Sequence, residues 1–329
     1  MNPRYRPLAA TTLIFVVAYT LCVMRYPAMF STRVFGNFLT DNAFLGIAAV
    51  GATFVILSGG IDLSIGAVIG LTGVVAAILI GKGMDPLIVF ALVLAMSACF
   101  GAVMGAVIYF LKVPSFIVTL AGMFLARGLA SVLTQDSLPI DSPLYQTIAN
   151  LYFRLPGGGR LSAIGILMLL VFLIFGFVAH RTRFGSYVYA LGGNPTSAAL
   201  MGVPTGSVTI GIYALSALLS GLAGIVYSLY TSAGYPLAAV GIELDAIAAV
   251  VIGGTLLTGG YGFVFGTLIG VMLQGLVQTY IVFDGTLSSW WTKIAIGALL
   301  FMFILLQKLV FHAGTGAGSG RARQKKALA

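Results

Sequence analysis

Few residues of this sequence could do chemistry, and Asp62 is the most distinctive of them. It lies in the segment Ser58-Gly-Gly-Ile-Asp62-Leu-Ser64, between two long apolar stretches. A carboxylate is costly where it faces lipid, so Asp62 must find partners. One interpretation is a helix cap, in which Asp62 accepts hydrogen bonds from backbone N–H groups at the start of the next helix. The alternatives are a polar lining of a transport path, shared with Ser58 and Ser64, and a proton relay.

Catalytic and metal chemistry find little support in the sequence. The two histidines, His180 and His312, lie beside basic residues, and the two cysteines, Cys22 and Cys99, lie in apolar runs. None has the spacing of a metal site or of a catalytic triad. The phosphate-binding pattern G-x-x-x-x-G-K-[ST] does not occur in the chain. We therefore expect neither an enzyme nor a bound cofactor.

The composition places these residues in a membrane. Of the 329 residues, 60% are hydrophobic and 8% are charged, whereas soluble domains carry about 25% charged residues. This excludes a soluble enzyme, a nucleic-acid-binding protein and a disordered chain. Glycine is abundant, with 43 residues, as in closely packed membrane helices. The spacings Gly101/Gly105 and Gly262/Gly266/Gly270 indicate close packing on one helix face, either within a subunit or between subunits.

The charge-free stretches predict the elements that position the polar residues. About 20 residues cross a bilayer as a helix, and continuously apolar runs favour helices over a barrel. The predicted fold is an all-α, polytopic transmembrane helical bundle of about ten helices within a membrane domain of residues 1–312. Both termini are predicted to be cytoplasmic, because that orientation places more Lys and Arg on the inner side. Residues 313–329 are predicted to form a disordered basic cytoplasmic tail that could touch membrane lipid. The ten helices are expected at residues 8–28, 38–57, 62–81, 86–110, 115–134, 161–179, 207–231, 244–257, 262–283 and 290–310.

One cytoplasmic segment, at about residues 180–206, has the signals of a short helix. Asn194 is a good N-cap and Pro195 a good first helical residue, and Gly202 ends the turns at 196–201. The segment is either an ordinary connector or a helix that docks a soluble partner.

Several segments resemble the sugar-importing ABC permeases of the ribose type. The resemblance rests on Leu57-Ser-Gly-Gly-Ile-Asp-Leu-Ser-Ile-Gly66, on Phe116–Gly128, on Tyr189-Ala-Leu-Gly-Gly-Asn194-Pro and on Ala248–Gly260, which occur in the order of that family. It implies that the segment at 180–206 couples the permease to an ATPase. It also implies that residues around 58–64 and 259–260 form helix breaks or the translocation pathway. The chain would then be a multi-pass protein of the bacterial inner membrane. The implied coupling residues are Gly192, Gly193, Asn194, Pro195, Thr196, Ala198, Ala199 and Gly202, and the implied pathway or break residues are Ser58, Gly59, Gly60, Asp62, Ser64, Gly259 and Gly260.

The resemblance also implies partners and a substrate. A separate cytoplasmic ABC ATPase would hydrolyse ATP, and a periplasmic sugar-binding protein would deliver the sugar. A second permease would complete the pathway; the resemblance favours a paralogue, and a homodimer is the alternative. Residues 156–163 and 283–297 are similar to a permease subunit of the galactofuranose importer, while L-arabinose, ribose or a related monosaccharide remains open. The alternative function is an ion-coupled secondary sugar transporter that uses Asp62.

Three further features have two interpretations each. Residues 58–70 match residues 258–270 at four glycines, which indicates either an internal repeat of parallel helices or chance. The intramembrane charge Arg127 either snorkels to the outer interface or forms a salt bridge or carbonyl clamp. The outer loop at 135–160 is either a connector or a docking surface for the delivery protein.

Overall fold

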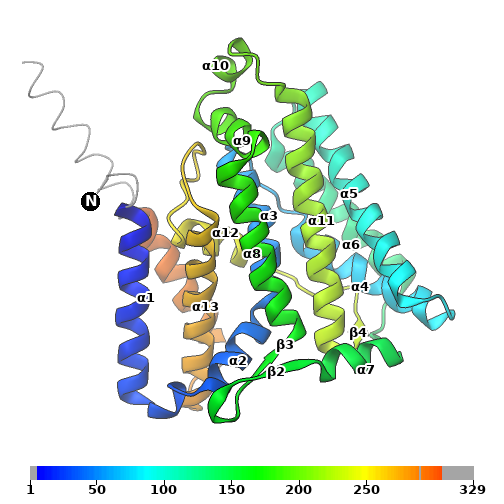
Figure 1. The fold of residues 1–329 in the computed structure, drawn as a ribbon. Coiled ribbons are helices and arrows are strands. Elements are labelled where there is room, and N and C mark those ends of the chain that lie inside the picture. Colours follow the sequence, from blue (N-terminus) through cyan, green and yellow to red (C-terminus); the bar gives the residue numbers. More distant parts are fainter. Residues whose placement is uncertain (1–5, 289, 306–329) are drawn as a thin grey trace, which may run out of the picture.

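The computed structural model describes residues 6–288 and 290–305, and these residues form a bundle of long helices (Figure 1). The short helix α10 (Pro195–Leu200) lies at one end of the bundle, and strands β2 (Tyr152–Arg154) and β3 (Arg160–Ser162) lie at the other. These are called the α10 end and the β2–β3 end below. The predicted tail at 313–329 lies outside the described residues. The remaining long helices are α1 (Arg6–Arg25), α3 (Ala43–Leu57), α4 (Ile65–Gly81), α5 (Pro86–Phe110), α6 (Ser115–Leu133), α8 (Ala163–Arg181), α11 (Thr205–Thr231) and α13 (Val264–Asp284).

The all-α polytopic fold is confirmed, but ten full spans are not. In the described part of the chain, six helices are long and apolar enough to cross a membrane, or seven when α2 (Thr32–Asp41) and α3 count as one span bent by 53°. Each of the ten predicted segments overlaps a helix in the part of the chain that the structure describes. However, α4 has 17 residues and α12 (Ile242–Ile252) has 11, because the chain leaves the helix at glycine-rich breaks before α4 and after α12.

These two breaks belong to helix pairs that run in the same direction. The Thr53 hydroxyl on α3 pairs with that of Thr267 on α13 at 2.8 Å, and Asn42, just before α3, lies against Gly275 further along α13. Helix α3 is therefore antiparallel to α13. Helix α12 is also antiparallel to α13, since Gly253 lies against Gly266, and it is thus parallel to α3.

Helix α11 fills the middle of the bundle and packs against α5, α3 and α4 (Figure 1). A Cβ added at Gly101 of α5 would lie 2.2 Å from the carbonyl oxygen of Tyr213 on α11, and one at Gly105 would lie 2.8 Å from the Cα of Ile210. The glycines at 101 and 105 therefore pack within one subunit, because only their lack of a Cβ lets the two backbones approach this closely.

The ends of the bundle are more structured than the sequence predicted. The outer loop at 135–160 contains α7 (Pro143–Asn150), and β1 (Leu138–Pro139) in it pairs with β4 (Ala233–Gly234) after α11. Strands β2 and β3 form an antiparallel hairpin. At the α10 end, the predicted connector contains α9 (Arg183–Gly193), capped by the Thr182 hydroxyl.

Candidate functional site

The predicted short helix is present as α10. Its N-cap Asn194 accepts a hydrogen bond from the backbone N–H of Ser197 at 2.8 Å, with Pro195 as first helical residue. Gly202 follows with φ +82°, a conformation in which glycine ends a helix at little cost. Ala198 is fully buried, whereas Leu200 is 86% exposed. The helix thus presents one face to the bundle and exposes apolar side chains on the other. Figure 1 shows that α10 lies at the tip of the bundle.

Three Gly-Gly pairs, distant in sequence, meet directly beside α10, and we call them the glycine junction. They are Gly59-Gly60 after α3, Gly192-Gly193 at the end of α9, and Gly259-Gly260 after α12. The backbone N–H of Gly260 donates to the carbonyl oxygen of Leu57 at 2.8 Å. A Cβ added at Gly259 would lie 2.6 Å from the nitrogen of Gly59, so no larger residue fits. The junction joins the segment that carries α10 to both helix breaks.

The two breaks have the same backbone conformation at their first glycine. Gly59 and Gly259, which occupy matching positions of the predicted repeat, both have φ +82°. The helices that follow begin at Ile65 and Val264. Together with the parallel direction of α3 and α12, this geometry supports an internal repeat rather than a chance match.

Asp62 is held inside the first break. It is 2% exposed, and its Oδ1 accepts hydrogen bonds from the Ser64 backbone N–H at 2.9 Å and the Ser64 hydroxyl at 2.6 Å. Its Oδ2 accepts from the Ser216 hydroxyl of α11 at 2.7 Å. The carboxylate therefore caps the backbone just before α4 and ties this break to α11. The Ser58 hydroxyl donates to the carbonyl of Val55.

Arg127 of α6 forms a carbonyl clamp, one of its predicted alternatives. Its Nη1 donates to the carbonyl oxygens of Pro236 and Ala238, at 2.6 and 2.8 Å. These carbonyls belong to the turns between β4 and α12. Arg127 thus fixes the path of the chain into α12.

A cavity of about 500 Å³ with both polar and apolar walls lies toward the β2–β3 end, where the sequence predicted no site. It is bounded by the junction of α2 and α3, the last turn of α11, α12, α13 and the helix at 290–305. Gln274 and Gln278 lie one turn apart in the apolar helix α13. Polar amides inside a membrane helix mark a functional site, and this pair is the sequence pattern from which the cavity could have been predicted. Its polar and aromatic lining residues are Asp41, Asn42, Phe44, Tyr227, Tyr230, Thr231, Asp245, Gln274, Gln278, Thr292 and Lys293.

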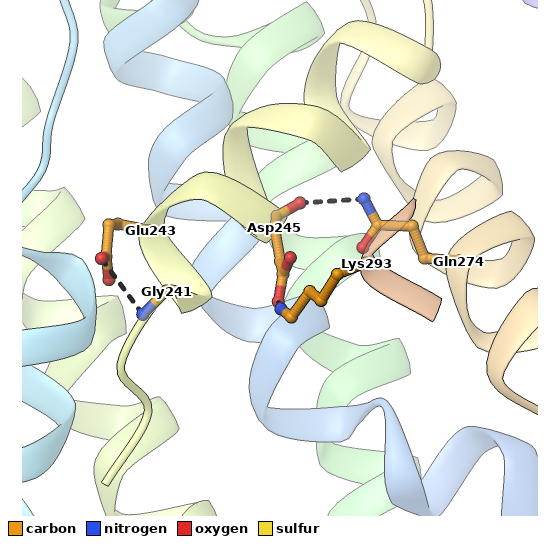
Figure 2. Close-up of polar contacts among 5 residues, drawn as sticks. All are labelled: Gly241, Glu243, Asp245, Gln274 and Lys293. Atoms are coloured by element: carbon orange, nitrogen blue, oxygen red, sulfur yellow. Dashed lines mark hydrogen bonds and ion pairs between the residues drawn. The ribbon is translucent and has the colours of Figure 1, made fainter. Parts of the chain in front are cut away.

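Figure 2 shows the polar contacts at one wall of this cavity. Lys293 donates to Asp245 Oδ2 at 2.5 Å, and Gln274 Nε2 donates to the Asp245 carbonyl oxygen at 3.0 Å. Glu243 lies on the opposite side of the first turn of α12, where it accepts the backbone N–H of Gly241. The pair Asp245–Lys293 therefore joins α12 to the helix at 290–305.

The structure separates the predicted site residues into two groups. The predicted glycines 59, 60, 192, 193, 259 and 260 come together in the glycine junction, next to α10, where Thr196 and Ala199 are exposed. Asp62 and Ser64 are buried within the chain, and neither they nor Ser58 line the cavity. In the described part of the chain, no group of three or more His, Cys, Asp or Glu side chains could hold a metal ion.

Long apolar helices, two helix pairs broken at glycine-rich segments, a projecting short helix and a cavity within the bundle are typical of a multi-pass membrane transport subunit. Residues 34–304 match the family described as the permease component of branched-chain amino acid transport systems. The chain belongs to this family.

Individual relatives confirm the resemblance to ribose-type permeases. The chain is 62% identical to the inner membrane ABC transporter permease protein YjfF of Escherichia coli (strain K12), over 94% of this chain and 93% of that protein. It is 38% identical to the ribose import permease protein RbsC of E. coli (strain K12) and 37% identical to the fructose import permease protein FruG of Bifidobacterium longum (strain NCC 2705), each over 92% of both chains. No solved structure matches the chain. The chain is a multi-pass protein of the bacterial inner membrane.

Proposed function

We propose that this chain is the permease subunit of an ABC importer for a monosaccharide. The observation that carries the proposal is α10, a short helix that projects apolar side chains from one end and adjoins the glycine junction. Permeases for ribose and fructose are similar to this chain along nearly its whole length. In this proposal the α10 end and both termini face the cytoplasm.

The energy source is a partner subunit that hydrolyses ATP, since the chain has no phosphate-binding loop of its own. Closure of two ATPase subunits moves α10, and the glycine junction passes that movement to the α3–α4 and α12–α13 breaks. Both breaks lie at the same level of the bundle, and the helices that precede them, α3 and α12, are parallel, so the two breaks tilt together. The ion-coupled alternative is less well supported, because both carboxylate oxygens of Asp62 accept hydrogen bonds inside the chain.

The finer assignment is galactofuranose as the sugar, with a paralogous permease as the second subunit and a periplasmic binding protein as the source of sugar. It rests on the resemblance of residues 156–163 and 283–297. The β2–β3 hairpin, which carries exposed Arg154 and Arg160, is the proposed docking surface for the binding protein. Competition between galactofuranose, L-arabinose and ribose for uptake in reconstituted vesicles tests the sugar.

The coupling role of α10 is tested by Ala198→Asp. Ala198 is fully buried, so a charge there displaces α10 from α9 and α11. We expect the variant to reach the membrane, to lose sugar uptake and to lose sugar-stimulated ATPase activity. Ser186→Asp is the matched control, because Ser186 is exposed on α9 at the same end of the bundle. Sugar-stimulated ATPase activity retained in Ala198→Asp, or wild-type uptake that needs a proton gradient and no ATP, contradicts the proposal.

A further inference from the structure

Gln274 has an unusual environment for an amide inside a membrane helix. The side chain is 2% exposed and lines the cavity at the β2–β3 end. Its Nε2 donates to the carbonyl of Asp245, whereas its buried Oε1 has no hydrogen-bond partner among the described residues. A buried polar atom without a partner is costly, and a ligand that donates a hydrogen bond to it would remove that cost.

The other walls of the cavity fit a compact polyhydroxylated molecule. Phe44 and Tyr227 pack edge to face at 5.1 Å between ring centroids and provide an apolar wall. Asp41 accepts the Tyr230 hydroxyl at 3.1 Å, and both residues line the cavity. Aromatic surface combined with a few fixed polar groups, in a volume between about 300 and 1,000 Å³, is typical of small-molecule sites.

The charges of the cavity select against anions. Two carboxylates, Asp41 and Asp245, line it together with one base, Lys293, which is already paired with Asp245. Carboxylate oxygens accept hydrogen bonds from hydroxyl groups but repel phosphate and carboxylate ligands. A neutral ligand rich in hydroxyl donors satisfies these groups.

We infer that this cavity is a monosaccharide-binding site contained within one permease subunit, in which Gln274 Oε1 accepts a sugar hydroxyl. This inference rests on the proposed function for the class of ligand. It goes beyond it by placing a binding site inside a single chain, away from Asp62 and the glycine junction. The Asp245–Lys293 pair closes the side of the site toward the helix at 290–305.

The site carries its own spectroscopic probe. The two tryptophans of the chain are Trp290 and Trp291, and the next two residues, Thr292 and Lys293, line the cavity. We expect D-ribose, D-fructose and D-galactose, added separately to the purified full chain in lipid nanodiscs, to produce at least one saturable change in tryptophan fluorescence. D-ribose 5-phosphate is expected to produce none, because of the acidic lining.

Substitutions assign the signal to the cavity. Gln274→Met keeps the length of the side chain and removes the acceptor, and we expect it to weaken sugar binding about tenfold. Gln146→Met, at an exposed position of α7 outside the cavity, is the matched control and is expected to bind as the wild type does. Thr231→Phe adds a ring at an exposed lining position and should also reduce binding. Because Thr231 is exposed, the added ring fills the cavity without adding bulk to the packed core.

The outcomes distinguish the inference from the proposed function. Absence of saturable sugar binding, or binding unchanged in both Gln274→Met and Thr231→Phe, overturns the inference even when ATP-driven uptake by the complete transporter is normal. Sugar binding with the expected sensitivity, in a complete transporter that does not couple ATP hydrolysis to uptake, supports the inference and contradicts the proposed function.

Discussion

Alanine at Gly192 is expected to destabilise the protein, whereas alanine at the neighbouring Gly193 is not. The Cβ of an alanine at 192 would lie 1.9 Å from the carbonyl oxygen of Leu57 and 2.4 Å from the nitrogen of Gly260. Both are backbone atoms, which no rotamer change can move aside. A Cβ at Gly193 has no atom within 4 Å. The two substitutions therefore add the same methyl group in adjacent residues with opposite steric results.

The size of the effect follows from the contacts that must be given up. Forcing one extra methyl group into a closely packed site costs about 1–3 kcal/mol. The Gly260 N–H to Leu57 carbonyl hydrogen bond, at 2.8 Å, is lost when the segments separate, which costs about 0.5–1.5 kcal/mol. We expect Gly192→Ala to be less stable than Gly193→Ala by roughly 1.5–4.5 kcal/mol, the sum of these two costs. The gain from replacing glycine by alanine in a helix is common to both variants and cancels in the comparison.

Unfolding of both variants in detergent, followed by circular dichroism, measures the free-energy difference. ATP-driven uptake in reconstituted vesicles measures the consequence for transport, and we expect it to fall only in Gly192→Ala, where the α9–α3–α12 contact opens. Equal stability of the two variants would refute the reasoning, because it would show that the three Gly-Gly pairs do not touch in the folded protein.

The remaining predictions concern the two buried polar clusters. Asp62→Asn keeps an acceptor for Ser64, so its free energy of unfolding should fall by no more than ~1 kcal/mol and uptake should be retained. Asp62→Leu leaves three donors unpaired, and its free energy of unfolding should fall by at least about 3 kcal/mol. Loss of uptake in a stable Asp62→Asn variant would favour a proton relay instead. Arg127→Met removes both hydrogen bonds to the carbonyls of Pro236 and Ala238 and should destabilise the protein by ~2 kcal/mol or more, with Arg127→Lys intermediate. Limited proteolysis between β4 and α12 measures the release of that segment. Unchanged cleavage in Arg127→Met would contradict the clamp.

Some local features of the fold were predictable because their causes are local. Helix α5 occupies the predicted residues 86–110, where Asp85 caps the first turn by accepting the N–H of Leu87 and Pro86 suits the first helical position. Helix α10 follows in the same way from Asn194 and Pro195. Continuous apolar runs of adequate length then predict membrane helices without knowledge of their neighbours.

Other features depend on contacts that sequence patterns do not encode. The bend between α2 and α3 and the helix α9 inside a predicted connector were missed. Gln274, Asp245 and Lys293 come from three different helices, so the cavity exists only once these are packed. The partner of Arg127 proved to be a pair of carbonyls 109 and 111 residues away, which no side-chain pattern marks.

The sequence by itself determined the membrane environment, the family, the capped short helix and the identity of the glycines at the breaks, because composition, caps and close-packing residues act over a few turns of chain. Only the tertiary structure decided that three Gly-Gly pairs form one junction, that Asp62 is bound to α11 through Ser216, and that the cavity lies at the opposite end from α10. These features depend on which helices become neighbours, and the packing of whole helices determines that. Only between packed helices does a missing Cβ allow two backbones to touch, or an amide oxygen remain without a partner.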